Sequence, residues 1–174
     1  TLELSSNQLV TLPTNLFHGL THIESLNLKY NQFTTFPTHA FHGLTNLESL
    51  YLDHNRLTTL PANIFDGLTN LVHLNLSNNQ LTSESLDVLN NLPKLKFIWL
   101  LNNQLITLPE GVFNNLPNLE YLHLEFNPLE MIHISIKEFI EQHPTLRLTM
   151  DRTLDSLTID SNYINEISLK SMLN

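Results

Sequence analysis

The chain has 174 residues, no cysteine and a formal net charge of −9, with only eight lysine and arginine residues. These basic residues are scattered along the sequence, whereas binding to phosphates needs a clustered basic stripe, so nucleic acid and anionic membranes are disfavoured as partners. No apolar run approaches the roughly 18 residues that a membrane-spanning helix needs.

An asparagine recurs every 24 residues from residue 7 to residue 127. Each is preceded at fixed offsets by two branched apolar residues, as in Leu26-x-Leu28-x-x-Asn31. This alternation predicts a short strand with both leucines on one side. Strands at a fixed interval stack as parallel neighbours, and the stacked units share a core that no single unit can close. The six asparagines are Asn7, Asn31, Asn55, Asn79, Asn103 and Asn127.

Each unit has further fixed positions, filled in the second copy by Phe33, Phe41, Gly43 and Leu44. The full pattern resembles the leucine-rich repeat in its 24-residue typical form, over residues 1–127 in about six units. The resemblance implies an α/β fold, namely a right-handed solenoid shaped like a horseshoe. Its parallel sheet would line the concave face.

The asparagine column predicts a ladder, because each side-chain amide can bond backbone groups that the turning chain would otherwise bury unpaired. Phenylalanines at one offset, each followed three residues later by leucine, predict a core spine near the outer side. Repeat four departs from this pattern: Leu89 takes the phenylalanine place, and Ser85 to Leu89 reads as more helical than its neighbours. The spine residues are Phe17, Phe41, Phe65 and Phe113, with Leu20, Leu44, Leu68 and Leu116.

Residues 128–151 are similar to the C-terminal cap of extracellular leucine-rich-repeat proteins. Met131 and His133 stand where that cap has cysteines, so its disulfides are absent. Ser135 and Glu138 have the spacing of a capping box for a short helix, which a following proline ends. A cysteine-free cap with one helix is therefore expected.

The period of the repeat extends one step into this cap. Counting 24 residues from Asn127 reaches Asp151, and this phase puts Leu146 and Leu148 in the strand positions. We therefore expect a seventh strand at about 146–150.

Residues 152–174 form a C-terminal extension outside the repeat phase. The segment 157–160 follows the seventh strand too closely for another parallel crossover, so it is predicted to fold back as an antiparallel edge strand. Residues 163–173 read as a weak helix. Together these elements would cover the open sheet edge with a hairpin.

Residues beside the strand leucines should form columns on the concave side, with neighbours about 4.8 Å apart. Repeats five and six place several aromatic residues there, including the only tryptophan. An exposed aromatic patch is costly unless covered, and aromatic anchors dominate binding hot spots. Alternatively, aromatic residues are simply good strand formers, or the C-terminal extension folds over them. The predicted partner-binding residues are Tyr30, Tyr51, Asp53, His54, His73, Phe97, Trp99, Leu101, Tyr121, His123, Glu125 and Phe126.

Enzymatic chemistry finds little support in the sequence. It contains no glycine-rich phosphate loop and no Gly-x-Ser-x-Gly segment. Ser77 near His54 and Asp53 is a conceivable catalytic group, but a flat sheet offers no oxyanion-hole loop. The histidines lie on different columns, so neither a metal site nor a cofactor is expected.

The leading hypothesis is a non-enzymatic module, monomeric in itself, that binds a protein partner through the concave face. The sequence resembles cysteine-free bacterial leucine-rich-repeat effectors or surface proteins, which would place it in a reducing cytosol, including that of a host cell. An extracellular adhesion or receptor-like module is the first alternative. A structural spacer is the second.

Overall fold

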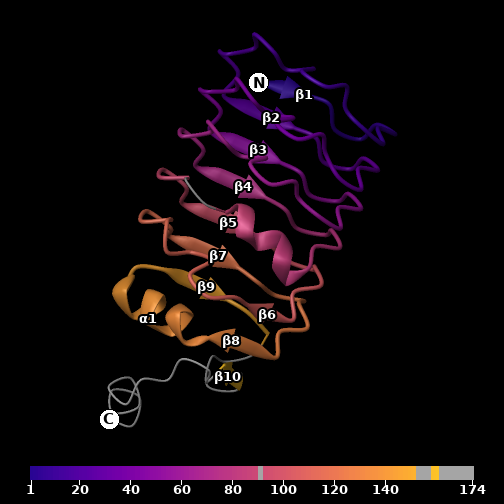
Figure 1. The fold of residues 1–174 in the computed structure, drawn as a ribbon. Helices are drawn as coiled ribbons and strands as arrows, with labels where there is room; N and C mark the ends of the chain where they lie inside the picture. The colour runs from indigo at the N-terminus through magenta and orange to yellow at the C-terminus, as the bar shows by residue number, and fades with distance from the viewer. Residues whose placement is uncertain (90–91, 152–157, 161–174) are drawn as a thin grey trace.

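The computed structural model describes residues 1–89, 92–151 and 158–160. Its main feature is a seven-stranded parallel sheet in which one strand comes from each successive coil (Figure 1). The strand order is β1-β2-β3-β4-β5-β7-β9. The strands are β1 Leu2–Glu3, β2 Ser25–Asn27, β3 Ser49–Tyr51, β4 His73–Asn75, β5 Phe97–Trp99, β7 Tyr121–His123 and β9 Arg147–Thr149.

The register of this sheet follows the sequence period. Leu26 pairs with Leu50, and Leu50 pairs with Leu74, so neighbouring strands are offset by one repeat of 24 residues. This confirms the predicted solenoid of stacked parallel strands. Its core is a continuous column of inward-facing leucines with Ile98, which is buried from Leu26 to Leu124, while Leu2 and Leu148 in the end strands are partly buried.

The phenylalanine spine closes the core on the side away from the sheet. Phe17, Phe41 and Phe113 are almost completely buried, and the rings of Phe17 and Phe41 lie 6.2 Å apart. Leu89 fills the same place in repeat four and is also buried. The prediction is wrong for Leu20, which is 40% exposed, whereas Leu44, Leu68 and Leu116 at the same offset are buried.

The asparagine ladder joins each coil to the one before it. Nδ2 of Asn55 donates to the carbonyl oxygens of Leu28, Leu52 and Asp53 at 3.1, 3.0 and 3.3 Å. Its Oδ1 accepts a hydrogen bond from the backbone N–H of Phe33 at 3.2 Å. The same four-bond pattern recurs at Asn31, Asn79, Asn103 and Asn127.

Asn7 opens the ladder and makes a smaller set of bonds. Its Nδ2 donates to the carbonyl oxygens of Leu4 and Ser5, which belong to its own coil. The residue is exposed. Asn7 has the ladder phase, but within the described residues it links no coil to another.

Repeat four is more helical on its outer side, as predicted. It forms a 3-10 helix, η1 Ser83–Val88, which Figure 1 shows as the coiled ribbon beside the stack. Ser83 Oγ accepts the backbone N–H groups of Ile106 and Thr107 in the following coil at 3.3 and 3.0 Å. The helix is thereby attached to repeat five.

A second, three-stranded parallel sheet lies at the C-terminal end, in the order β10-β8-β6. Its strands are β6 Thr107–Leu108, β8 Met131–His133 and β10 Thr158–Asp160. The prediction of an antiparallel edge strand at 157–160 is wrong, because β10 pairs in parallel with β8 rather than folding back on β9. The predicted helix at 163–173 lies outside the described residues.

The cap contains the predicted helix, α1 Ile134–Gln142, which ends before the proline at 144. The predicted capping box is wrong: His133 is the N-cap residue, and its Nδ1 accepts the backbone N–H of Ser135 at 3.2 Å. Ser135 Oγ instead accepts the N–H of Gly111 in the preceding coil at 3.0 Å. At nine residues, α1 is too short to cross a membrane, and within the described ranges no helix is long and apolar enough to do so.

The seventh strand is present as β9, but its register differs from the expected one. Leu148, and not Leu146, pairs with Leu122. The connection through β8 and α1 is two residues longer than a regular repeat, so Asp151 falls opposite Glu125 rather than Asn127. Its Oδ2 accepts the backbone N–H of Phe126.

Candidate partner-binding surface

The face of the seven-stranded sheet opposite the core, here called the open face, carries four rows of side chains. Strand alternation buries one residue and leaves its two neighbours half-buried, as at Phe97, Ile98 and Trp99. The first row is Ser25, Ser49, His73, Phe97, Tyr121 and Arg147, and the second is Asn27, Tyr51, Asn75, Trp99, His123 and Thr149. The third row is Lys29, Asp53, Ser77, Leu101 and Glu125, and the fourth is Tyr30, His54, Asn78, Asn102 and Phe126.

Three rings of the first row form a continuous stack across repeats four, five and six. His73 and Tyr121 each lie 4.7 Å from Phe97 between ring centroids, with interplanar angles of 8° and 13°. The guanidinium of Arg147 lies 5.3 Å from the centroid of the Tyr121 ring and ends the stack as a cation–π contact. The spacing of the strands thus sets the spacing of the rings.

The second row adds Trp99 and His123, which lie 6.1 Å apart at an angle of 6°. Trp99 also lies 5.7 Å from Phe97, so the two rows contact each other. Thr149 Oγ1 and His123 Nδ1 are 2.7 Å apart and fix the imidazole. We call His73, Phe97, Trp99, Tyr121 and His123 the aromatic cluster.

Two apolar residues extend this cluster toward the other rows. Leu101 is half-buried and follows Trp99 on the open face. Phe126 is 68% exposed and has a positive φ of 59°. Asn78 and Asn102 hold the same conformation in the same row, and asparagine adopts it readily. Tyr30 and His54 of the same row also have a positive φ, and each of these rings costs about 1–2 kcal/mol of backbone strain.

The predicted residues of repeats two and three form a separate group. Tyr30 is 49% exposed and stacks on His54 with 4.2 Å between ring centroids. His54 Nε2 lies 3.3 Å from Asn78 Nδ2, which continues the fourth row as a chain of polar contacts. Among the described residues, no ring contact joins Tyr30, Tyr51 or His54 to the aromatic cluster.

Two carboxyl groups of the third row have opposite pKa shifts. Burial raises the pKa of Asp53, and hydrogen bonding to its own backbone and the charges of His54 and Lys29 offset only part of that effect. Burial also acts to raise the pKa of Glu125, but hydrogen bonds from Thr149 and its own backbone, together with His123, lower it overall. Glu125 is therefore held in its charged form.

The sequence-based catalytic grouping does not form. His54 Nε2 lies 4.0 Å from Asp53 Oδ2 and bonds Asn78 rather than Ser77. Ser77 Oγ is buried without a hydrogen-bond partner in the part of the chain that the structure describes. Within the same residues, no group of three or more metal-binding side chains gathers.

The structure adds Arg147 and Thr149 to the site, which sequence reasoning missed. Both lie on β9 and contact rings of repeat six. Their rows follow from the register of β9, which the longer cap connection shifts by two residues. The length of that connection is visible in the sequence, but the register of β9 follows from it only when the number of residues in α1 and its flanking loops is known.

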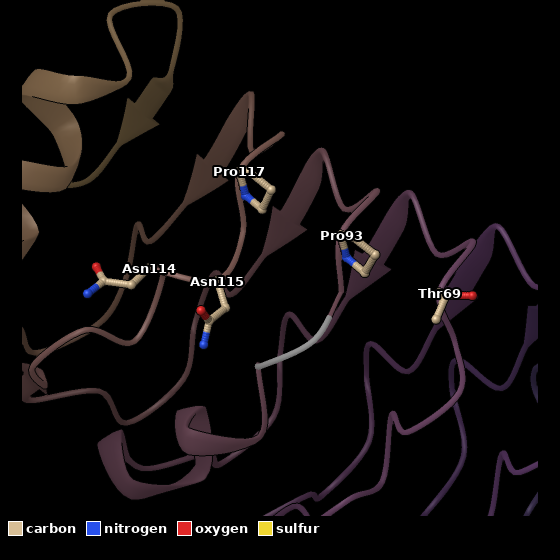
Figure 2. A pocket seen from close by; sticks show the side chains of 5 residues that line it. All are labelled: Thr69, Pro93, Asn114, Asn115 and Pro117. Atoms are coloured by element: carbon tan, nitrogen blue, oxygen red, sulfur yellow. The ribbon is translucent and has the colours of Figure 1, made fainter.

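Two hollows among the described residues lie away from the aromatic cluster. One of about 490 Å³ is lined by loop residues of three successive coils, Thr69, Pro93, Asn114, Asn115 and Pro117 (Figure 2). Another of about 320 Å³ lies against α1, with Ser135 and Phe139 in its wall. Neither contains a residue of the aromatic cluster, which stands on an open sheet and suits a macromolecular partner better than an enclosed small ligand.

Solved structures with similar folds carry leucine-rich repeats. The leucine-rich repeat domain of APL1B is 28% identical, with a TM-score of 0.69 over 76% of this chain. A leucine-rich-repeat protein of Leptospira interrogans is 36% identical, with a TM-score of 0.66 over 82%. A chain of the complex of Latrophilin 3, Unc5D and FLRT2 (LRR) is 26% identical, with a TM-score of 0.71 over 97%.

The present chain spans 40%, 35% and 53% of those three chains, respectively. No curated protein sequence shows significant similarity to it. The family model described as "Leucine rich repeat" matches residues 1–57 and 45–105, which is more than half of the sequence. The chain therefore belongs to the leucine-rich repeat family.

Proposed function

We propose that this chain is a non-enzymatic recognition module that binds a protein partner through its open face, centred on repeats five and six. The observation that carries the proposal is the aromatic cluster, whose rings stand half-buried on the solvent side of the sheet. Large aromatic side chains dominate the energetics of protein interfaces.

The order of the cluster supports this role. Each ring is held by a neighbour 4.7–6.2 Å away, and Arg147 and Thr149 fix the C-terminal end. Side chains that are already ordered lose little conformational entropy when a partner covers them. A preformed surface of this kind favours binding.

Two settings for such a module remain, and one observation supports each. A bacterial effector or surface protein is supported by the likeness to the Leptospira interrogans protein, and a chain without cysteine suits a reducing cytosol. An extracellular receptor-like module is supported by the likeness to a chain from the complex of Latrophilin 3, Unc5D and FLRT2.

The test is capture of partners by the immobilised chain from candidate lysates, followed by mass spectrometry. The double variant Trp99→Ala/Tyr121→Ala should lose the partners that the wild type retains. Tyr30→Ala/Tyr51→Ala removes two rings from the same face in repeats two and three and should lose much less. Equal recovery by wild type and the Trp99/Tyr121 variant, with both folded by circular dichroism, would refute the proposal.

A further inference from the structure

Three oxygen atoms in the third row of the open face lack hydrogen-bond partners. They are Asp53 Oδ1, Ser77 Oγ and Glu125 Oε2, each buried and unpaired within the described residues. We call these three residues the acceptor row. A buried acceptor without a donor costs free energy, so a set of three on one row calls for an explanation.

The two carboxylates of the acceptor row are only partly enclosed. The side chain of Asp53 keeps 11% of its surface exposed, and that of Glu125 keeps 24%. Their other oxygens lie 4.0 Å from His54 and 3.7 Å from His123. Each carboxylate therefore has one oxygen near a histidine and a second, buried oxygen without a hydrogen-bond partner within the described residues. Because rotation of a carboxylate exchanges its two oxygens, a donor that arrives on the open face can pair with either one.

The residue between Ser77 and Glu125 in this row is Leu101, which lies next to the aromatic cluster. A long basic side chain needs an apolar surface for its stem and acceptors for its head, and these positions supply both. The open face already holds one guanidinium against a ring, because Arg147 lies over Tyr121. Lys29 precedes Asp53 in the row and would repel a cation, so a cation is favoured on the side toward Leu101.

We propose that the protein partner presents arginine side chains to the acceptor row while its apolar groups cover the aromatic cluster. This inference rests on the proposed function and names the chemistry of the partner. The net charge of −9 favours a basic segment, and a guanidinium offers five donors to the partly exposed carboxylates of Asp53 and Glu125. Three strand spacings separate Asp53 from Glu125, about 14 Å, so roughly four extended residues would span the row.

The experiment uses hexa-arginine as the probe and hexa-citrulline as its neutral isostere, titrated into the whole chain. Trp99 is the only tryptophan and lies beside the row, so its fluorescence reports binding, with calorimetry as a second measurement. Hexa-arginine should bind saturably and hexa-citrulline much more weakly. Absence of a saturable signal, or equal binding of the two peptides, would overturn the inference.

Isosteric variants locate the site. Asp53→Asn/Glu125→Gln should raise the Kd for hexa-arginine by about tenfold or more, because charge-assisted hydrogen bonds are lost. The matched control, Asp66→Asn/Glu84→Gln, removes the same charge from exposed positions away from the open face and should change the Kd by about twofold at most. Equal losses in both variants would show unspecific attraction and overturn the assignment.

Failure here can be told apart from failure of the proposed function. If the acceptor-row variants bind hexa-arginine like the wild type while Trp99→Ala/Tyr121→Ala still loses its partners, only the arginine assignment falls. If partner capture does not depend on Trp99 and Tyr121, the proposed function falls whatever the peptides show. Thermal unfolding of every variant checks that a loss of binding is not a loss of fold.

Discussion

The open face is polar in repeats two and three and aromatic in repeats five and six, although the backbone of the two regions is the same. The first row carries Ser25 and Ser49 in one region and Phe97 and Tyr121 in the other, at equivalent positions of the same parallel register. Their buried leucines and ladder bonds are equivalent. Folding therefore constrains the inward residues, whereas the side chains of the open face differ from repeat to repeat.

Stability and recognition therefore use separate residues in each coil. A leucine or ladder asparagine cannot change without disturbing two coils, because its contacts lie in its own coil and the preceding one. A residue of the open face contacts mainly its equivalents in adjacent coils. Four predictions test this separation.

The largest expected effect is on binding. Trp99→Ala should weaken partner binding by about 2–4 kcal/mol, as truncation of a central aromatic anchor does, while Tyr51→Ala in the same row should cost under about 0.5 kcal/mol. Calorimetry with the captured partner measures both. Similar losses at the two positions would show that the two regions do not differ in function.

The next effect is on stability. Asn79→Ala should lower the free energy of unfolding by about 1–3 kcal/mol, because it leaves buried backbone groups of two coils unpaired. Asn7→Ala should change it little, since Asn7 is exposed and bonds only its own coil among the described residues. Urea denaturation compares them, and equal midpoints would contradict the ladder.

Phe126→Asn should act in opposite directions on stability and binding. Asparagine tolerates the positive φ of this position, so the free energy of unfolding should rise by about 1 kcal/mol. Partner binding should weaken at the same time, because the exposed ring is lost. A variant that gains stability and keeps its full affinity would remove Phe126 from the binding surface.

The smallest expected effect is the pH dependence of the two carboxylates. The raised pKa of Asp53 means that stability is lost as pH rises from the ordinary value of 3.8 through the folded-state pKa. Asp53→Asn should therefore stabilise the chain at pH 7. The lowered pKa of Glu125 contributes stability above the ordinary value of 4.5 that is lost as pH falls, so Glu125→Gln should destabilise at pH 7.

Denaturation midpoints between pH 3 and pH 7 check both substitutions. The two variants should diverge from each other as the pH rises. A shift of the same sign for Asp53→Asn and Glu125→Gln at pH 7 would show that burial does not dominate at Asp53.

Sequence reasoning reaches the repeat scaffold because its signals are periodic and local. The phase of Asn31 and Asn55 gives the strands, the register and the ladder, all of which the structure bears out. It fails where the period ends. Packing between coils decides that Leu148 pairs with Leu122, that His133 is the N-cap residue and that β10 pairs in parallel. The unpaired oxygens of the acceptor row are invisible in sequence, since they arise from what neighbouring side chains leave uncovered.

The asparagine ladder has a direction along the chain. Asn127 bonds the N–H of Leu105 and the carbonyl of Leu100, both in the coil before its own, and the rungs from Asn31 to Asn103 do the same. During synthesis, a coil that has just left the ribosome still lacks the amide that its successor will supply. The ladder of a growing chain is thus complete only up to the last coil but one. Asn127 is the last rung, and the cap follows it.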